Sequence, residues 1–264
     1  MTTNTPDLDV AGTVAEIHTG QGYVVLPGLL PSDLATTIRT QILACADADK
    51  AHDKLIMQNG RWRVRLVGRG AVFMELAVHS AITRIAEAML GAGFVMGGLS
   101  AHTITASAPP QGVHVDYPYS VMSEPFPDTP MQLQAIWALD AFTEENGATR
   151  VLPHSQKTRR RPDRQEFYDK SIPVLCPAGS LILSHGGLWH DSATNRSQAD
   201  RVAILGNYTP FWVKSVEGFP DTIKSPDFHP TPAQRKLLGY DTRDAMMKAV
   251  AWKREDKNAP KPPY

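Results

Sequence analysis

"PPQGVHVDYPY" (residues 109–119) places a histidine and an aspartate one residue apart, just after two prolines. The composition of this stretch predicts an extended chain. On a strand, residues i and i+2 point to the same face. His114 and Asp116 can therefore present one nitrogen and one oxygen to a common point. The pair is a candidate for two of the ligands of a metal ion.

A third ligand is expected downstream, because two ligands seldom hold a catalytic metal well. His190 follows a β-type run in "SLILSHGGLWHDSATNRSQADRVAIL" (residues 180–205). Two nitrogens and one carboxylate on one face of a metal are typical of non-haem Fe(II) oxygenases. The sequence predicts His114, Asp116 and His190 as catalytic metal ligands. Other histidines compete for the third position, namely His102, His154 and His185.

Arg201 follows His190 by eleven residues, and Ser192 follows it by two. If the co-substrate is 2-oxoglutarate, its keto-acid end chelates iron and its far carboxylate needs a partner. A guanidinium matches a carboxylate with two parallel hydrogen bonds, which Lys cannot do. Ser192 can add a hydroxyl donor. The alternatives are a surface ion pair of Arg201 with Asp200 and an ordinary turn hydroxyl for Ser192.

The rest of the chain predicts helices first and an antiparallel β core afterwards. Residues 22–30 indicate a strand and a turn, and Ser32 is the expected N-cap of the helix that follows. Residues 61–68 alternate as a strand does, and residues 72–91 have helical periodicity ending at Gly91. Beyond residue 93, short β-type runs are separated by turn signals, which favours a sandwich or barrel. The final residues predict a loosely held tail.

Composition excludes several classes of partner. The 264 residues are 42% hydrophobic and 20% charged, and 27 basic residues balance 27 acidic ones. We therefore expect no nucleic-acid partner and no membrane partner. The N-terminus lacks the pattern of a signal peptide, and no apolar run approaches the ~18 residues of a membrane span. Two cysteines without CxxC spacing fit the reducing cytoplasm.

Five segments between residues 18 and 215 resemble the phytanoyl-CoA dioxygenase family, a branch of the Fe(II)/2-oxoglutarate oxygenases. "GYVVLPGLL" resembles its opening, and "VFMELAVHSAI" resembles its middle helix. "QGVHVD" matches its first metal motif. "HDSATNRSQADR" matches its distal pattern. "TEENGATRVLPHS" resembles a segment that usually ends Pro-Gly-Ser-His, although His154 stands here in place of that glycine.

The resemblance implies a mainly β fold with flanking helices, namely a double-stranded β-helix (jelly roll, cupin-like). It implies one domain, with a helical part at about 1–92, a jelly-roll core at about 93–215 and a C-terminal extension at about 216–264. The co-substrate would be held by Arg201 and Ser192 at its distal carboxylate. Gln111 and Thr149 match positions that contact the co-substrate in some members.

The implied function is oxidation, foremost hydroxylation, of an unactivated C–H bond of a small organic metabolite. The reaction would use Fe(II) as cofactor, consume 2-oxoglutarate and O2, and release succinate and CO2. The resemblance favours a role in secondary metabolism. A free or carrier-bound amino acid stays open as substrate, and so does a homo-oligomeric state. Two alternatives of other classes are a zinc-dependent cupin-type hydrolase or isomerase and a non-catalytic binding module.

Two basic segments bear on the substrate. Arg61, Arg63 and Arg65 alternate along one face of the expected strand. We expect that face to be solvated, because charged residues are mostly exposed. The alternative is a cationic wall at the substrate mouth that recognises a carboxylate or phosphate. The loop 157–164, "KTRRRPDR", leaves the same choice between a solvated loop and a site for an anion such as a CoA ester.

Overall fold

The computed structural model describes residues 8–215 and 228–240. Its main feature is a seven-stranded sheet in the order β1-β8-β5-β10-β4-β3-β2, in which every neighbouring pair is antiparallel. The strands are β1 (Tyr23–Leu26), β2 (Ile56–Gln58), β3 (Arg61–Arg65), β4 (Val95–Ile104), β5 (Leu133–Ala138), β8 (Leu181–His185) and β10 (Arg201–Thr209).

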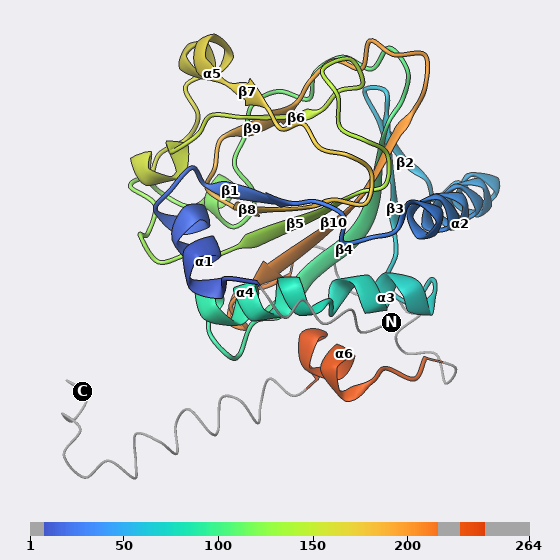
Figure 1. The fold of residues 1–264 in the computed structure, drawn as a ribbon, viewed down its shortest axis with the longest axis horizontal. Helices are drawn as coiled ribbons and strands as arrows, with labels where there is room; N and C mark the ends of the chain where they lie inside the picture. Colours follow the sequence, from blue (N-terminus) through green and yellow to red (C-terminus); the bar gives the residue numbers. More distant parts are fainter. Residues whose placement is uncertain (1–7, 216–227, 241–264) are drawn as a thin grey trace.

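A small antiparallel sheet lies over the large one, as Figure 1 shows. Its order is β7-β6-β9, with β6 at Thr149–Val151, β7 at Ile172–Pro173 and β9 at His190–Ser192. The two facing antiparallel sheets make a jelly roll. The expected fold, mainly β with flanking helices, is confirmed.

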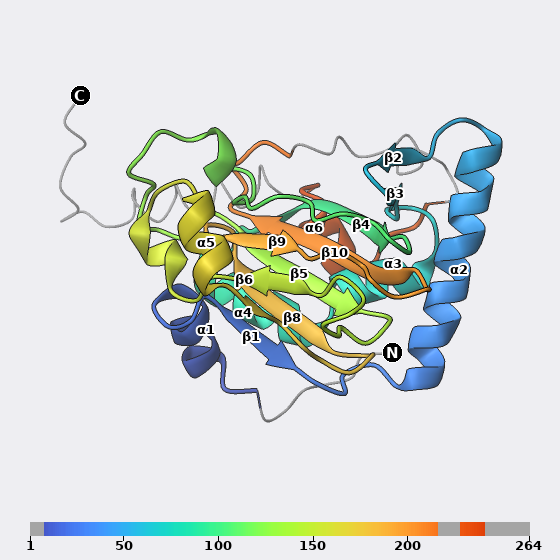
Figure 2. The same ribbon diagram turned by 90° about the horizontal axis from the view of Figure 1, so that it is seen from above.

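Helices cover the other face and the ends of the large sheet. α3 and α4 lie beneath it, and α2 runs along its side (Figures 1 and 2). The helices are α1 (Val10–His18), α2 (Ser32–Ala51), α3 (Ala71–Ala77), α4 (Ser80–Leu90), α5 (Arg164–Lys170) and α6 (Pro232–Leu237). Within the described ranges, none of them has the length and apolar character needed to cross a membrane.

The central strand β5 explains how the two layers are joined. All six of its residues are buried, because the helices cover one face of the sheet and the small sheet covers the other. Leu133, Ala135 and Trp137 belong to the core shared with the helices, whereas Ile136 belongs to the core between the sheets. Gln134 shares the inner face with Ile136 and lines a cavity there. Successive side chains of this strand thus point alternately to the core under the helices and to the cavity between the sheets.

The helical segment 72–91 differs from expectation in one respect. It forms two helices instead of one, with the break at Val78 and His79. His79 has an extended backbone, and its Nδ1 accepts a hydrogen bond from the Ala81 N–H at 3.3 Å, so a histidine caps α4. Gly91 ends α4 with a φ of 90°, as expected.

The start of α2 also differs from expectation. Ser32 is the first helical residue, whereas Pro31 occupies the N-cap position and makes no side-chain cap bond. The predicted Ser32 cap is therefore wrong by one residue. The strands expected within residues 22–30 and 61–68 are found as β1 and β3, and both join the large sheet together with β2. The predicted C-terminal tail lies outside the described residues.

His154 adopts a backbone conformation that glycine favours. Its φ of 67° lies in the left-handed region that favours glycine. Its Nδ1 donates to the carbonyl oxygen of Gly20 at 2.8 Å, and its backbone N–H donates to Gln21 at 3.0 Å. The substituted histidine therefore ties the turn after β6 to the turn between α1 and β1.

Candidate metal centre

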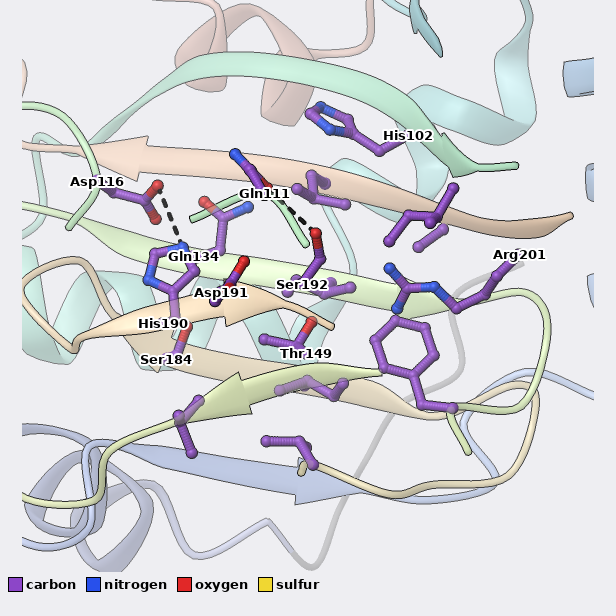
Figure 3. A pocket seen from close by; sticks show the side chains of 18 of the residues that line it. His102, Gln111, Asp116, Gln134, Thr149, Ser184, His190, Asp191, Ser192 and Arg201 are labelled. Carbon is purple, nitrogen blue, oxygen red and sulfur yellow. Dashed lines mark hydrogen bonds and ion pairs between the residues drawn. The ribbon is translucent and has the colours of Figure 1, made fainter. Parts of the chain in front are cut away.

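His114, Asp116 and His190 come together at one point. Each offers a ligand atom that lies within 4.8 Å of the other two, and no other such cluster occurs in the described part of the chain. His190 Nε2 and Asp116 Oδ1 are 3.7 Å apart, as the dashed line in Figure 3 marks. Two imidazole nitrogens and one carboxylate oxygen form the donor set that suits non-haem iron.

Backbone pairing sets the spacing of the two histidines. The N–H of His114 donates to the carbonyl of His190 at 3.0 Å, and the reverse bond is 3.1 Å. Residues 109–119 do not form a regular strand, since His114 makes an isolated bridge with His190. The extended geometry is nevertheless kept, and Asp116 N–H bonds the Gly186 carbonyl at 2.9 Å.

Both histidines are fixed in the tautomer that a metal requires. His114 Nδ1 lies 2.9 Å from the carbonyl oxygen of Gly112, and His190 Nδ1 lies 2.9 Å from that of Leu188. A carbonyl can only accept, so each Nδ1 carries the hydrogen. Each Nε2 then keeps a free lone pair. Burial, followed by the neighbouring His190, lowers the pKa of His114, which favours the neutral ring that binds metal.

Asp116 is oriented by an amide. Gln132 Nε2 lies 3.3 Å from Asp116 Oδ2, and the same amide lies 2.7 Å from Asn207 Oδ1. Gln132 is fully buried and comes from the segment that enters β5. Outer partners of this kind orient a ligating carboxylate. Sequence reasoning missed Gln132, and nothing in the local pattern singles it out.

Arg201 is the first residue of β10 and points into the cavity between the sheets (Figure 3). Only 5% of its surface is exposed. Its Nε and one terminal nitrogen have no hydrogen-bond partner among the described residues. Burial, followed by the charge of Arg61, lowers the pKa of Arg201 to about 9, so the guanidinium is still charged at neutral pH. A buried cation with unused donors is suited to an anionic ligand.

Ser192, Gln111 and Thr149 line the same cavity. Ser192 Oγ accepts from Arg61 Nε at 3.2 Å and from Arg61 Nη2 at 2.9 Å, and it donates to Gln111 Oε1 at 3.4 Å. Thr149 pairs with Ser192 across β6 and β9. The serine hydroxyl is thus engaged by Arg61, a residue to which the sequence alone gave no such role.

The rival histidines do not join the metal cluster. His185 Nδ1 accepts from the Gly187 N–H, and His154 bonds the Gly20 carbonyl. His102 lines the cavity, but its Nε2 lies 3.0 Å from Ser100 Oγ. Burial, with the charges of Arg63 and Arg201, lowers the pKa of His102 to about 3, so this ring is neutral at physiological pH.

The cluster and Arg201 line one cavity of about 280 Å³. A second cavity, of about 440 Å³, lies against the β2–β3 hairpin. The two cavities share wall residues, which are Arg61, Arg63, His102, Gln111 and His114. The expected solvated face is therefore wrong for Arg61 and Arg63, which face the cavities. Arg65, at the end of the strand, is exposed as expected.

The basic loop 157–164 is held by partners within the chain. Arg160 pairs with Glu166 at 2.8 Å and lies over the Trp189 ring at 5.1 Å. The backbone N–H of Arg161 donates to the Glu124 carboxylate, and its guanidinium donates to the Met122 carbonyl. Most residues of the loop are exposed, as the solvated-loop expectation has it, and Arg161 in addition ties the loop to the segment around Glu124.

Comparison with known proteins agrees with this geometry. A jelly roll with a cluster of two histidines and one carboxylate facing an internal cavity defines a class of candidate metal-dependent proteins. The sequence profile of the phytanoyl-CoA dioxygenase (PhyH) family matches residues 19–203, and the chain belongs to that family.

Two relatives illustrate the spread of sequences. An uncharacterised protein of Mycobacterium tuberculosis is 33% identical over 109 residues, a match that spans 41% of this chain and 40% of the relative's length. The dioxygenase trt7 of Aspergillus terreus is 26% identical over 265 residues, covering 92% of this chain and 88% of the relative.

The fold is also found among solved structures. The epimerase SnoN from nogalamycin biosynthesis, in complex with Fe3+, alpha ketoglutarate and nogalamycin RO, superposes with a TM-score of 0.61 at 20% identity. The match covers 84% of this chain and 92% of that one. At this identity the likeness supports the fold.

Proposed function

We propose that the chain is a non-haem Fe(II)- and 2-oxoglutarate-dependent dioxygenase acting on a small organic molecule. Family membership supports the reaction class. The observation that carries the proposal is the presence, in one cavity, of the His114–Asp116–His190 cluster and of buried Arg201. When bound, iron with 2-oxoglutarate and O2 supplies the oxidising chemistry, with release of succinate and CO2.

Each residue of the site has a defined task in this proposal. His114, Asp116 and His190 bind the metal, and their outer partners fix the rings and the carboxylate. Arg201 holds the distal carboxylate of 2-oxoglutarate with its unused donors. Ser192, Gln111 and Thr149 line the path between the metal and Arg201. A zinc-dependent hydrolase would leave Arg201 without a partner, which disfavours that alternative.

Part of the remaining cavity wall is apolar. Apolar side chains from both sheets line it, namely Ile136, Val151, Val174, Ile182, Ala203 and Leu205. An apolar lining lowers the effective dielectric constant and so strengthens the electrostatic interactions of the charged groups beside it. These residues come from β5, β6, β8, β10 and the segment after β7, so the jelly roll itself provides the enclosure.

The second cavity is the place we propose for the primary substrate. It borders His114, so a bound molecule would lie beside the metal. Arg61 and Arg63 contribute positive charge, and the described residues of its lining include no carboxylate. We therefore favour a small metabolite that carries an acidic group. Hydroxylation of an unactivated C–H bond is the outcome we propose, in secondary metabolism and in the cytoplasm.

The test is a screen for compounds that stimulate conversion of 2-oxoglutarate to succinate in the presence of Fe(II) and O2. Matched pairs of carboxylic acids and their methyl esters should be compared, with the product identified by mass. We expect acids to stimulate turnover more than esters, and Arg63→Gln to reduce that preference. Failure to form succinate under any condition, including uncoupled turnover, would contradict the enzyme assignment.

A further inference from the structure

Asp191 is a buried carboxylate that neither the metal nor the co-substrate accounts for. It stands between His190 and Ser192 on β9, and only 1% of its surface is exposed. A charge at such a position is costly unless strong hydrogen bonds compensate it. The hydrogen-bond partners of its two oxygens therefore indicate the role of this residue.

Both oxygens accept bonds from segments near the metal cluster. Oδ1 accepts from the backbone N–H of Gly112 at 2.9 Å, and Oδ2 accepts from the Tyr168 hydroxyl at 2.9 Å. Tyr168 belongs to α5, which lies above the small sheet in Figure 1. The Gly112 carbonyl in turn accepts the Nδ1 hydrogen of His114. The backbone of one residue, Gly112, thus connects the carboxylate to a ligand ring.

The two histidines differ in how their carbonyl partners are held. Leu188, the partner of His190, lies in a turn closed by its own backbone bond to His185 at 2.9 Å. Gly112, the partner of His114, has a φ of 104° and lies outside any regular element. Its N–H bonds a side chain from another segment. The Asp191 side chain therefore helps to hold the backbone partner of His114, together with the bond from the Gln111 N–H to the Ser192 carbonyl at 3.2 Å. The partner of His190 is held by local backbone.

We propose that Asp191, itself oriented by Tyr168, is a positioning residue that holds the Gly112 backbone and so the His114 ring in its metal-binding orientation. This inference rests on the proposed function, because it takes the His114–Asp116–His190 cluster to bind Fe(II). Neither residue touches the metal in this account. Loss of outer partners of metal ligands typically costs about 10–100-fold in affinity.

The test measures Fe(II) affinity by anaerobic calorimetric titration of the full chain, together with the melting temperature of the metal-free protein. Asp191→Ala should weaken Fe(II) binding about 10–100-fold. Tyr168→Phe should weaken it a few-fold, because Asp191 keeps its bond to Gly112 but loses its own support. The Fe(II) affinity of Asp191→Asn should lie between those of Asp191→Ala and Tyr168→Phe, since its amide oxygen can still accept from the Gly112 N–H.

Two variants are matched controls. Asp169→Asn removes an exposed carboxylate on α5 that accepts hydrogen bonds from Gln165. Tyr119→Phe removes a buried hydroxyl that accepts from the Met131 N–H and has no link to Gly112. We expect Tyr119→Phe to lower the melting temperature while Fe(II) affinity stays at the wild-type value, and Asp169→Asn to change neither.

The outcomes distinguish a failure of the metal site from a failure of the positioning role of Asp191. Wild-type protein that binds no Fe(II) overturns the metal site and the positioning role together. Tight binding by both wild type and Asp191→Ala overturns the positioning role alone. If Asp191→Ala does not fold, the Fe(II) affinities of Tyr168→Phe and Asp191→Asn test the proposal. Wild-type Fe(II) affinity in both variants overturns it.

Discussion

The guanidinium carbon of Arg201 lies 3.9 Å from the centre of the Phe142 ring, and both side chains are buried in the cavity wall. The aromatic face and the burial together hold this cation in one position before any ligand arrives. A planar guanidinium can stack on a ring and still direct two N–H groups at a carboxylate, which an ammonium cannot do.

This arrangement predicts that Arg201→Lys raises the KM for 2-oxoglutarate by roughly 10–100-fold, because a charge-assisted bidentate pair is lost. The measurement is succinate formation at varied 2-oxoglutarate concentration. Arg150→Lys is a matched control on β6 of the small sheet, since its side chain bonds Ser171 and does not line the cavity. Equal KM values for wild type and Arg201→Lys would show that the co-substrate binds elsewhere.

Ser192→Ala should have a weaker effect than Arg201→Lys. The serine hydroxyl already accepts two bonds from Arg61, so its direct contribution to the co-substrate is expected to be that of one neutral hydrogen bond. That is about 1 kcal/mol, or roughly a five-fold rise in the KM for 2-oxoglutarate. A loss as large as that of Arg201→Lys would mean that the hydroxyl turns away from Arg61 when the co-substrate binds.

Acid should destabilise the metal-free protein through buried histidines. His185 Nδ1 accepts from the Gly187 N–H, and burial lowers the pKa of His185 to about 3 from 6.5. Between these values the unfolded chain binds a proton that the folded chain refuses. The free energy of unfolding is therefore highest above pH 6.5 and falls towards pH 3, by up to about 1.4 kcal/mol per pH unit for each such histidine.

Urea unfolding with chelator at pH 7.5, 6.0 and 5.0 measures this slope. His185→Gln keeps an acceptor for the Gly187 N–H but does not titrate. We expect a shallower pH dependence in this variant than in the wild type. Identical slopes in the two proteins would remove His185 from the explanation.

Arg160→Ala tests the structural role of the basic loop. The variant loses the ion pair with Glu166 and the contact with the Trp189 ring. Since the Arg160 side chain is 47% exposed, the expected loss of stability is only about 1 kcal/mol. Kinetic constants for 2-oxoglutarate and for an acidic substrate should stay unchanged. A substrate KM that rises with full stability retained would instead make this loop a binding surface.

Spacing along the chain predicted the metal cluster and Arg201 because these depend on strand alternation and on the turn between two strands. His114 and Asp116 point to one side even though their segment forms only a single bridge. Alternation in β10 likewise turns Arg201 inward with Ala203 and Leu205. The directions of these side chains follow from a period of two, whereas the meeting of His190 with His114 depends on the pairing of two distant segments.

Other features depend on contacts between distant segments and could not be predicted locally. Exposure of charged residues is the general rule, yet β3 turns Arg61 and Arg63 into the cavities because Trp62 and Val64 fill the core on its other face. That signal was present in the alternation of residues 61–65. The roles of Gln132 and Asp191 left no such signal, since their partners come from segments far away in sequence.

The most direct measurement of the central claim is the visible absorption spectrum of the protein after anaerobic addition of Fe(II) and 2-oxoglutarate. We expect a charge-transfer band in the wild type, its loss in Asp116→Ala and His190→Ala, and its retention in His102→Gln, which changes a histidine of the same cavity outside the cluster. Absence of the band in the wild type, or its persistence in both cluster variants, would contradict the account.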